Sequence, residues 1–228
     1  MNRAPFQSGE WYHIYNRGVD KRDIFISPGD YERFLMLLYC ANNIEPVHIG
    51  EARMSTFQDV LLFGRKQPLV DIGVYCLMPN HIHLLVRDLT DSGVSLFMQK
   101  MSTGYTGYFN RKESRTGSLF SGTFKSKHVS DDRYLKRVAN YIHANAAELV
   151  ESKWKQGVIA HRVRTVAFLK SYRYSSLPDY QNGPIRLESK IINKSSLLDC
   201  YENIESLSIN TLLTDAVDFA REEEESLF

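Results

Sequence analysis

The order of apolar and polar residues at the start of the chain predicts a strand followed by a helix. Residues 11–15 are aromatic and β-branched and lead into Asn16-Arg17-Gly18, which is typical of a strand that ends in a turn. The segment Ser27-Pro28-Gly29-Asp30 then combines a helix breaker with a plausible cap. Apolar residues repeat at helical spacing over residues 31–41, so we expect an amphipathic helix there.

The middle of the chain predicts an antiparallel hairpin. Residues 44–68 show weak periodicity and scattered charge, so a loop or insertion is expected. Residues 70–78 form a β-branched apolar run, Pro79-Asn80 interrupts it, and residues 81–87 alternate strictly between apolar and polar. Two strands joined by a tight turn account for this pattern.

A helix, a strand and a second helix are expected in the part that follows. Apolar residues lie at helical spacing from Gly93 to the turn at Gly117-Ser118, and residues 120–129 alternate loosely around Gly122. The segment Ser130-Asp131-Asp132 offers an N-cap and an acidic first turn for a helix over about residues 133–150.

This order of elements predicts the fold class. Strand, helix, strand, strand, helix, strand is the split βαβ plan of a ferredoxin-like (RRM-like) antiparallel sheet, here with one helix added behind it. We therefore expect an α+β protein with a catalytic domain over residues 1–180. Residues 181–228 are expected to form a helical extension of unknown role, with one or two helices over residues 197–225.

Composition narrows the class without identifying the function. The apolar share of 43% and the charged share of 24% are ordinary for a globular protein. We find no apolar run long enough to cross a bilayer and no signal peptide, so a cytoplasmic protein is expected. The cysteines Cys40, Cys76 and Cys200 are too scattered for a zinc site or a disulfide framework. A net charge of +1 means that any nucleic-acid surface must be local, and residues 111–137 are the most basic stretch.

A histidine pair is the first candidate for chemistry. On a strand, His81 and His83 share one face, while Ile82 and Leu84 share the other. Two neutral imidazoles side by side on a rigid strand can bind one divalent ion. An isolated His-x-His is more often a pair of half-buried polar residues, so the pattern needs support from elsewhere.

Several further segments supply that support, because together they resemble a known family. Residues 76–86 read CLMPNHIHLLV. The segments 12–18 (YHIYNRG), 117–126 (GSLFSGTFKS) and 141–145 (YIHAN) accompany them in the order typical of the family. The chain thus resembles the Y1 transposases, the single-tyrosine HUH enzymes of the IS200 type, and most closely their REP-associated branch. The resemblance covers about residues 10–180.

The resemblance implies a nucleophile and a metal site. Tyr141 matches the family's nucleophilic tyrosine, and Asn145, one helical turn later, matches a polar residue that can complete the metal site with His81 and His83. The ion is expected to be Mg²⁺ or Mn²⁺. A helix-surface role for Asn145 is about as plausible, and Tyr134, Tyr105 and Tyr108 compete for the role of nucleophile.

The sequence also departs from the family pattern. Ala146-Ala147 stands where Pro-Val is usual, and Ser121 and Thr123 replace the more frequent Gln and Arg. These changes spare the proposed catalytic groups and put substrate affinity, and the activity of this copy, in question. His143, His128 and His13 have no assigned role, and His143 is expected to be structural or to face DNA.

Basic residues around the predicted catalytic helix form the candidate DNA surface. Their charges can neutralise phosphates without regard to sequence, although a solvated helix face explains them almost as well. The members of this surface are Lys125, Lys127, Arg133, Lys136 and Arg137.

By resemblance, the expected reaction is a transesterification on single-stranded or hairpin DNA that leaves a 5′-phosphotyrosine. One rival is a catalytically silent nucleic-acid-binding regulator derived from a transposase. A second rival is a metal-dependent hydrolase with a water nucleophile, for which Tyr141 would be dispensable. A monomer and a homodimer both remain open.

Overall fold

The protein is built around one four-stranded antiparallel sheet. A computed structural model describes residues 5–45, 56–198 and 209–225. The strands follow the order β2-β3-β1-β4 across the sheet. This is the ferredoxin-like order expected from the sequence, so the predicted fold class is confirmed. The strands are β1 (Trp11–Arg17), β2 (Val70–Met78), β3 (His81–Asp88) and β4 (Lys125–Val129).

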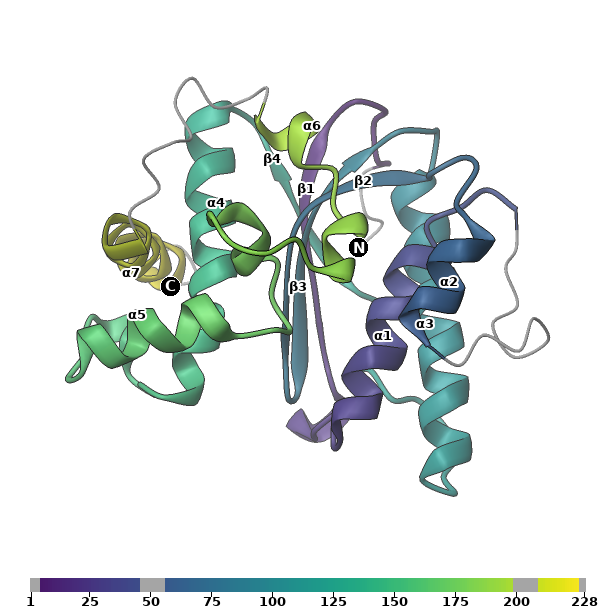
Figure 1. Cartoon of the computed structure of the whole chain (residues 1–228), viewed down its shortest axis with the longest axis horizontal. Coiled ribbons are helices and arrows are strands. Elements are labelled where there is room, and N and C mark those ends of the chain that lie inside the picture. The colour runs from purple at the N-terminus through teal and green to yellow at the C-terminus, as the bar shows by residue number, and fades with distance from the viewer. Residues whose placement is uncertain (1–4, 46–55, 199–208, 226–228) are drawn as a thin grey trace.

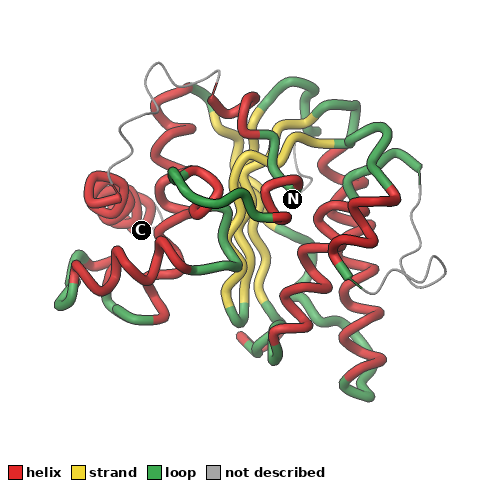
Figure 2. Tube along the Cα trace, viewed as in Figure 1, coloured by secondary structure: helices red, strands yellow, loops and turns green. Residues whose placement is uncertain are grey.

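Helices cover both faces of this sheet. Figures 1 and 2 show α1, α2 and α3 on one side of the strands and α4, α5 and α7 on the other. The helices are α1 (Pro28–Cys40), α2 (Phe57–Phe63), α3 (Gly93–Lys112), α4 (Asp132–Ala144), α5 (Arg162–Ser171), α6 (Lys194–Leu198) and α7 (Ile209–Glu225). Short 3₁₀ turns lie at Val19–Lys21, Asn145–Leu149, Trp154–Gln156, Leu177–Tyr180 and Leu187–Lys190.

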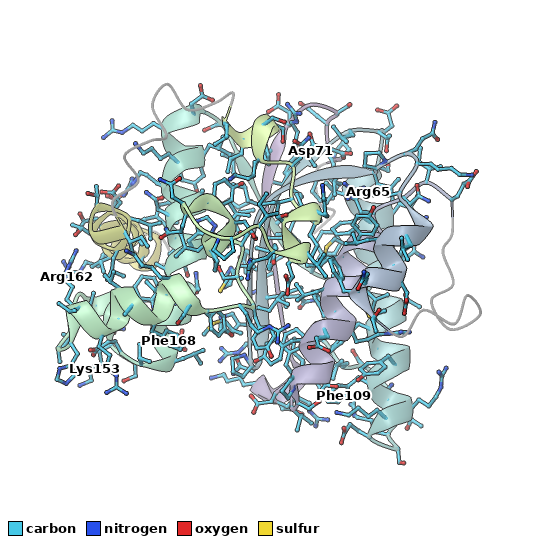
Figure 3. The ribbon with its side chains drawn as sticks, viewed as in Figure 1. Arg65, Asp71, Phe109, Lys153, Arg162 and Phe168 are labelled. Carbon is cyan, nitrogen blue, oxygen red and sulfur yellow. The ribbon has the colours of Figure 1, made fainter. Side chains whose placement is uncertain are left out.

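The alternation of each strand divides the apolar residues between two cores. Ile14 and Leu84 are buried with α1 and α3, whereas Trp11 and Leu85 are buried with α4 and α7. Figure 3 shows Phe109 on the α3 side and Phe168 on the α5 side of the sheet. Residues of β1 and β3 that face the second layer therefore point toward α4.

The register of β1 fixes which side chains can meet. Tyr15 is paired with His83 of β3 on one side and with Lys125 of β4 on the other. His13 is paired with Leu85 and with Lys127. Because directly paired residues share a face, β1 brings the histidines of β3 and the lysines of β4 to the same face of the sheet.

The start of helix α4 agrees with the sequence prediction, and its end differs. The Asp131 side chain accepts a hydrogen bond from the Tyr134 backbone nitrogen at 2.8 Å, as an N-cap should. The helix was expected to reach residue 150, but it ends at Ala144 and tightens into the 3₁₀ turn Asn145–Leu149. Asn145 caps the helix, and its Nδ2 donates to the Tyr141 carbonyl at 2.7 Å.

Two other expectations need correction. Residues 44–68 were expected to be a loop, yet Phe57–Phe63 forms α2, capped by Thr56 and Asp59. A strand was expected over residues 120–129, but pairing with β1 in a continuous ladder begins at Lys125. Phe120 makes only an isolated bridge to Gly18, because Gly122 at φ 74° turns the chain before the strand begins.

The C-terminal helix α7 packs directly on α4. Phe219 of α7 is buried, and its ring centroid lies 5.6 Å from that of Tyr134 and 5.3 Å from that of Tyr141. Arg137 of α4 forms an ion pair with Glu222 of α7 at 2.8 Å. The predicted helices over residues 197–225 are therefore present in the described part, and residues 199–208 lie outside it.

None of the helices within the described ranges is long and apolar enough to cross a bilayer.

Candidate functional site

A cluster of three imidazoles lies on the face of the sheet that α4 covers. The rings of His81 and His83 have centroids 5.1 Å apart, and His13 of β1 lies 5.2 Å from His83. His13 Nε2 and His83 Nδ1 are within hydrogen-bond distance at 2.9 Å. His81 and His83 therefore share one face, as the alternation of β3 predicts, and His13 joins them from the neighbouring strand.

All three imidazoles are neutral at pH 7. Burial, together with the nearby Lys127, lowers the pKa of His13 to about 3. Burial and the charge of Lys155 lower the pKa of His81 to about 4, and burial holds the pKa of His83 well below 6.5. A neutral imidazole keeps a lone pair, which is the state that binds a metal ion.

Tyr141 lies against this cluster. Its ring meets His83 edge-on with centroids 5.8 Å apart, and His13 in the same manner at 6.2 Å. Burial raises the pKa of the Tyr141 hydroxyl, while the charge of Lys155 and hydrogen bonds from Lys155 and Asn145 act in the opposite direction. The hydroxyl is thus protonated in the resting protein and has cationic and amide donors beside it.

Asn145 is completely buried at the C-cap of α4. Its Nδ2 is bonded to the Tyr141 carbonyl, but its Oδ1 has no hydrogen-bond partner within the described residues. A buried amide oxygen without a partner is costly unless something binds it. This orphaned oxygen has the chemistry of a ligand for a hard divalent ion.

Lys155 and Glu148 complete the site, and sequence reasoning missed both. Lys155 Nζ lies 3.3 Å from Glu148 Oε2 and 5.8 Å from the centroid of the Tyr141 ring. Lys155 belongs to the 3₁₀ turn Trp154–Gln156, and Trp154 is fully buried beneath Tyr141. The buried tryptophan therefore anchors the turn that carries the lysine to the tyrosine.

These groups surround one cavity of about 550 Å³. Its functional side chains come from five elements, so the fold assembles a site that no single segment contains. They are His81, His83, Tyr141, Lys125, Glu148 and Lys155.

The three competing tyrosines lie elsewhere. Tyr105 is buried on the α3 side of the sheet, and its hydroxyl donates to the Ile24 carbonyl. Tyr108 donates to Asp30 at 3.0 Å on that same side. Tyr134 packs on Phe219 and does not line the cavity. Of the four tyrosines considered from the sequence, Tyr141 is therefore the one that lines the cavity. Tyr15 of β1 lines it as well, with its ring centroid 5.9 Å from that of His83.

The structure divides the predicted DNA surface. Lys125 lines the cavity, and Lys127 shares its face of β4, 5.6 Å from the Tyr134 ring. Arg133 and Lys136 are exposed on α4. Arg137 forms an ion pair with Glu222 of α7. The basic residues around Arg137 in the sequence gave no indication of this partner.

Two of the remaining histidines have structural surroundings. His143 is buried, and its Nε2 lies 3.0 Å from Ser176 Oγ, so of the two expected roles the structural one applies. His128 is exposed and lies 2.8 Å from Glu10 Oε2. His13 belongs to the cluster, and only the cross-strand register could have linked it to His83.

The donors fit a metal ion only if the amide takes part. Within the described residues, no group of three or more His, Cys, Asp and Glu side chains is placed to hold an ion. His81 Nδ1 lies 2.6 Å from Asn80 Oδ1, so this nitrogen carries the hydrogen and Nε2 keeps its lone pair. His81 and His83 line the cavity, whereas Asn145, whose side-chain oxygen has no partner among the described residues, is not one of the lining residues.

Comparisons with known proteins agree with this geometry. The family model described as "Transposase IS200 like" matches residues 39–145, a segment that contains His81, His83, Tyr141 and Asn145. A solved structure described as a REP-associated tyrosine transposase bound to a REP hairpin is similar in fold, with a TM-score of 0.50 and 10% identity. The similarity covers 82% of this chain and 89% of that chain. No curated protein matches.

The resemblance inferred from the sequence motifs is confirmed. A model of the IS200-like transposases matches residues 39–145, and the fold is similar to that of a REP-associated tyrosine transposase.

Proposed function

We propose that the protein cuts and rejoins single-stranded DNA by forming a covalent bond between Tyr141 and a 5′-phosphate. The observation that carries this proposal is the contact of Tyr141 with His83 inside one cavity, beside Lys125 and Lys155. A nucleophile, a potential metal site and cations for a phosphate converge there. DNA transesterification uses these three components.

His81, His83 and Asn145 would hold the metal ion, Mg²⁺ or Mn²⁺. When bound, the ion would polarise the scissile phosphate and stabilise the charge that develops on it. His13 would act as a positioning residue, because its hydrogen bond to His83 Nδ1 orients that ring and leaves Nε2 for the ion.

The chain's own groups perform the remaining steps. Tyr141 Oη attacks the phosphorus, the new Oη–P bond forms, and the bond from phosphorus to the 3′-oxygen of the preceding nucleotide breaks. The proton lost by the tyrosine hydroxyl is balanced by the proton gained by the released 3′-hydroxyl. Lys155, which forms an ion pair with Glu148, offers positive charge beside Tyr141. Because the energy of the broken bond is kept in the phosphotyrosine, a 3′-hydroxyl can reverse the step and join strands.

Hairpin-containing DNA is the proposed partner. The similar solved structure is described as bound to a REP hairpin, and this chain shares its fold. Lys125 and Lys127 on one face of β4 provide phosphate contacts close to the tyrosine, without reference to base sequence.

The substitution Tyr141→Phe tests the nucleophile. It removes one oxygen and keeps the ring, so packing against Phe219 and Trp154 should persist while adduct formation and cleavage disappear. The assay is incubation of labelled single-stranded hairpins with Mn²⁺, followed by a denaturing gel that reveals a covalent protein–DNA adduct.

The same gel separates the alternatives. If Tyr141→Phe still forms an adduct, Tyr134 or another tyrosine is the nucleophile. If this variant cleaves without an adduct, water is the nucleophile. If the unaltered protein binds DNA but neither cleaves nor forms an adduct, the protein is a silent regulator.

A further inference from the structure

A second cavity lies next to the catalytic cavity. It has a volume of about 690 Å³ and is formed between α3 and residues 118–124. Asn16 lines both cavities. Its Nδ2 donates to the Gly122 carbonyl at 3.3 Å, which ties this segment to the end of β1.

The two cavities differ in charge. Lys125 and Lys155 line the catalytic cavity, whereas the residues that line the second one, all within the described ranges, carry no charge. Phe124 and Lys125 are consecutive, yet Phe124 lines the second cavity and Lys125 the first. A strand of DNA that passes over this segment would leave a phosphate-binding environment and enter a neutral one.

The second cavity is lined by both apolar and polar side chains. Met98, Phe120 and Phe124 are the apolar lining residues, and all three are buried. The other lining residues include several with hydroxyl or amide side chains. Two of these groups already form hydrogen bonds within the protein: the Asn110 amide donates to the Gly117 carbonyl, and the Ser118 hydroxyl donates to the Phe120 carbonyl. Within the described residues, six others make no side-chain hydrogen bond and are available to a ligand: Ser95, Gln99, Ser102, Thr103, Thr106 and Thr123.

We propose that this neutral groove binds an unpaired nucleobase of the strand whose phosphate occupies the catalytic cavity. The inference rests on the proposed function. A base has apolar faces and a polar edge of donors and acceptors. The apolar and the hydroxyl or amide side chains that line the groove match these two features. Because the lining lacks cations, the groove reads bases and leaves the phosphates to Lys125 and its neighbours. Five of the six available groups lie on α3, so this helix takes part in selecting the DNA.

The test compares two probes on the full-length protein. One is a single-stranded oligonucleotide of mixed sequence, and the other has the same length and backbone but abasic sites in place of its bases. The double variant Thr103→Val and Thr106→Val removes two hydroxyls while keeping side-chain shape. The matched control is Thr116→Val, an exposed threonine outside the groove.

We expect the double variant to bind the base-containing strand about tenfold more weakly, as the loss of two hydrogen bonds implies. Its affinity for the abasic strand and its salt dependence should not change, because no charge is removed. Thr116→Val should bind both probes like the unaltered protein. Thermal melting of each variant shows whether the fold is kept.

Two results would overturn the inference. An equal loss of affinity for both probes would mean that the groove contacts the backbone, and unchanged affinities for both probes would mean that the groove does not bind DNA. The adduct assay run in parallel separates this failure from failure of the proposed function. If Tyr141 forms the adduct while the ratio stays unchanged, the function stands and the base site does not.

Discussion

At the scale of single residues, the environment of Tyr141 decides what the site can do. Its hydroxyl lies in a buried setting that raises its pKa, and Lys155 is the cation that acts against this effect. Lys155 is itself held by Glu148. A fixed positive charge beside a nucleophile stabilises the negative charge that develops during attack on a phosphate, more strongly in a buried site than in water.

Replacing Lys155 should therefore slow the chemical step. Lys155→Met keeps the length of the side chain and removes its charge, so single-turnover adduct formation should fall by about 10²-fold. Lys155→Arg should restore part of the rate. Lys153→Met is the matched control, because Lys153 lies at the exposed surface (Figure 3) and does not line the cavity. Equal rates for Lys155→Met and Lys153→Met would show that Lys155 has no part in catalysis.

His143 should make the stability of the protein depend on pH. Burial lowers its pKa to about 3, whereas in the unfolded chain the pKa is about 6.5. The unfolded state therefore binds the extra proton, and the stabilisation is complete above pH 6.5 and is lost as the pH falls toward 3.

The substitution His143→Gln isolates this effect. The unaltered protein should lose about 2 kcal/mol more unfolding free energy than the variant between pH 7 and pH 5. Urea titrations at the two pH values measure the difference, and the other histidines are common to both proteins. Equal losses would mean that His143 is protonated in the folded protein.

The sequence predicts part of the candidate site and leaves the rest open, for physical reasons. Alternation along β3 is enough to place His81 and His83 on one face, and the structure agrees. Tyr141 and Asn145 depend on the resemblance to a family, because a helical tyrosine has no local signature. His13 and Lys155 reach the site through strand register and through a turn anchored by Trp154, and neither is encoded by nearby residues.

At the scale of elements, α4 carries Tyr141 and α7 supports α4. Phe219 contacts Tyr134 and Tyr141, and Glu222 pairs with Arg137. The basic run alone suggested that Arg137 faces DNA, but its ion pair fastens the two helices together. The position of Tyr141, the proposed nucleophile, is thus supported by a helix that lies about 70 residues further along the chain.

Removing the Phe219 ring should affect both stability and chemistry. Phe219→Ala should cost about 3–5 kcal/mol of unfolding free energy, because a buried aromatic side chain leaves a cavity. Adduct formation should also slow under conditions in which the variant remains folded, since Tyr141 loses a neighbour. Leu62→Ala on α2, where the side chain is 82% exposed, is the control and should change stability by less than about 0.5 kcal/mol. A destabilised Phe219→Ala with an unchanged rate would limit α7 to a structural role.

Elements with strong periodicity could be predicted, and weakly patterned ones could not. The strands β1, β2 and β3 and the helices α1 and α3 carry clear alternation or helical spacing. Helix α2 is short and follows a weakly patterned stretch. The capping residues Thr56 and Asp59 alone were therefore not enough to predict a helix there. Residues 120–124 alternate like a strand, but Gly122 turns the chain away from continuous pairing.

At the scale of the whole molecule, charge is gathered locally on a nearly neutral chain. The net charge is +1, so long-range attraction to DNA is expected to be weak, and the proposed DNA binding would depend on the cations around the cavity. Lys125 and Lys127 of β4 share the face of His13 and Tyr15. Lys125 lines the cavity, and we propose that both lysines contact phosphates of the bound strand.

The double variant Lys125→Ala and Lys127→Ala tests this distribution. It should weaken single-strand binding and reduce the slope of log affinity against log salt by about 1.4, since each phosphate contact on a single strand contributes about 0.7. Fluorescence anisotropy over a salt series gives the slope. The control Lys66→Ala and Lys190→Ala, outside the cavity, should keep it. If both double variants had the slope of the unaltered protein, DNA would follow another path.

The central position of β1 restricts how proteins of this design can change in length during evolution. One inserted residue in β1 would turn His13 and Tyr15 toward the α3 side, because successive side chains point to opposite faces. Two inserted residues would keep the face but shift these side chains along the sheet by about 7 Å, away from His83 and Lys125. Insertions and deletions among relatives should therefore be excluded from β1 and fall in the connections between elements.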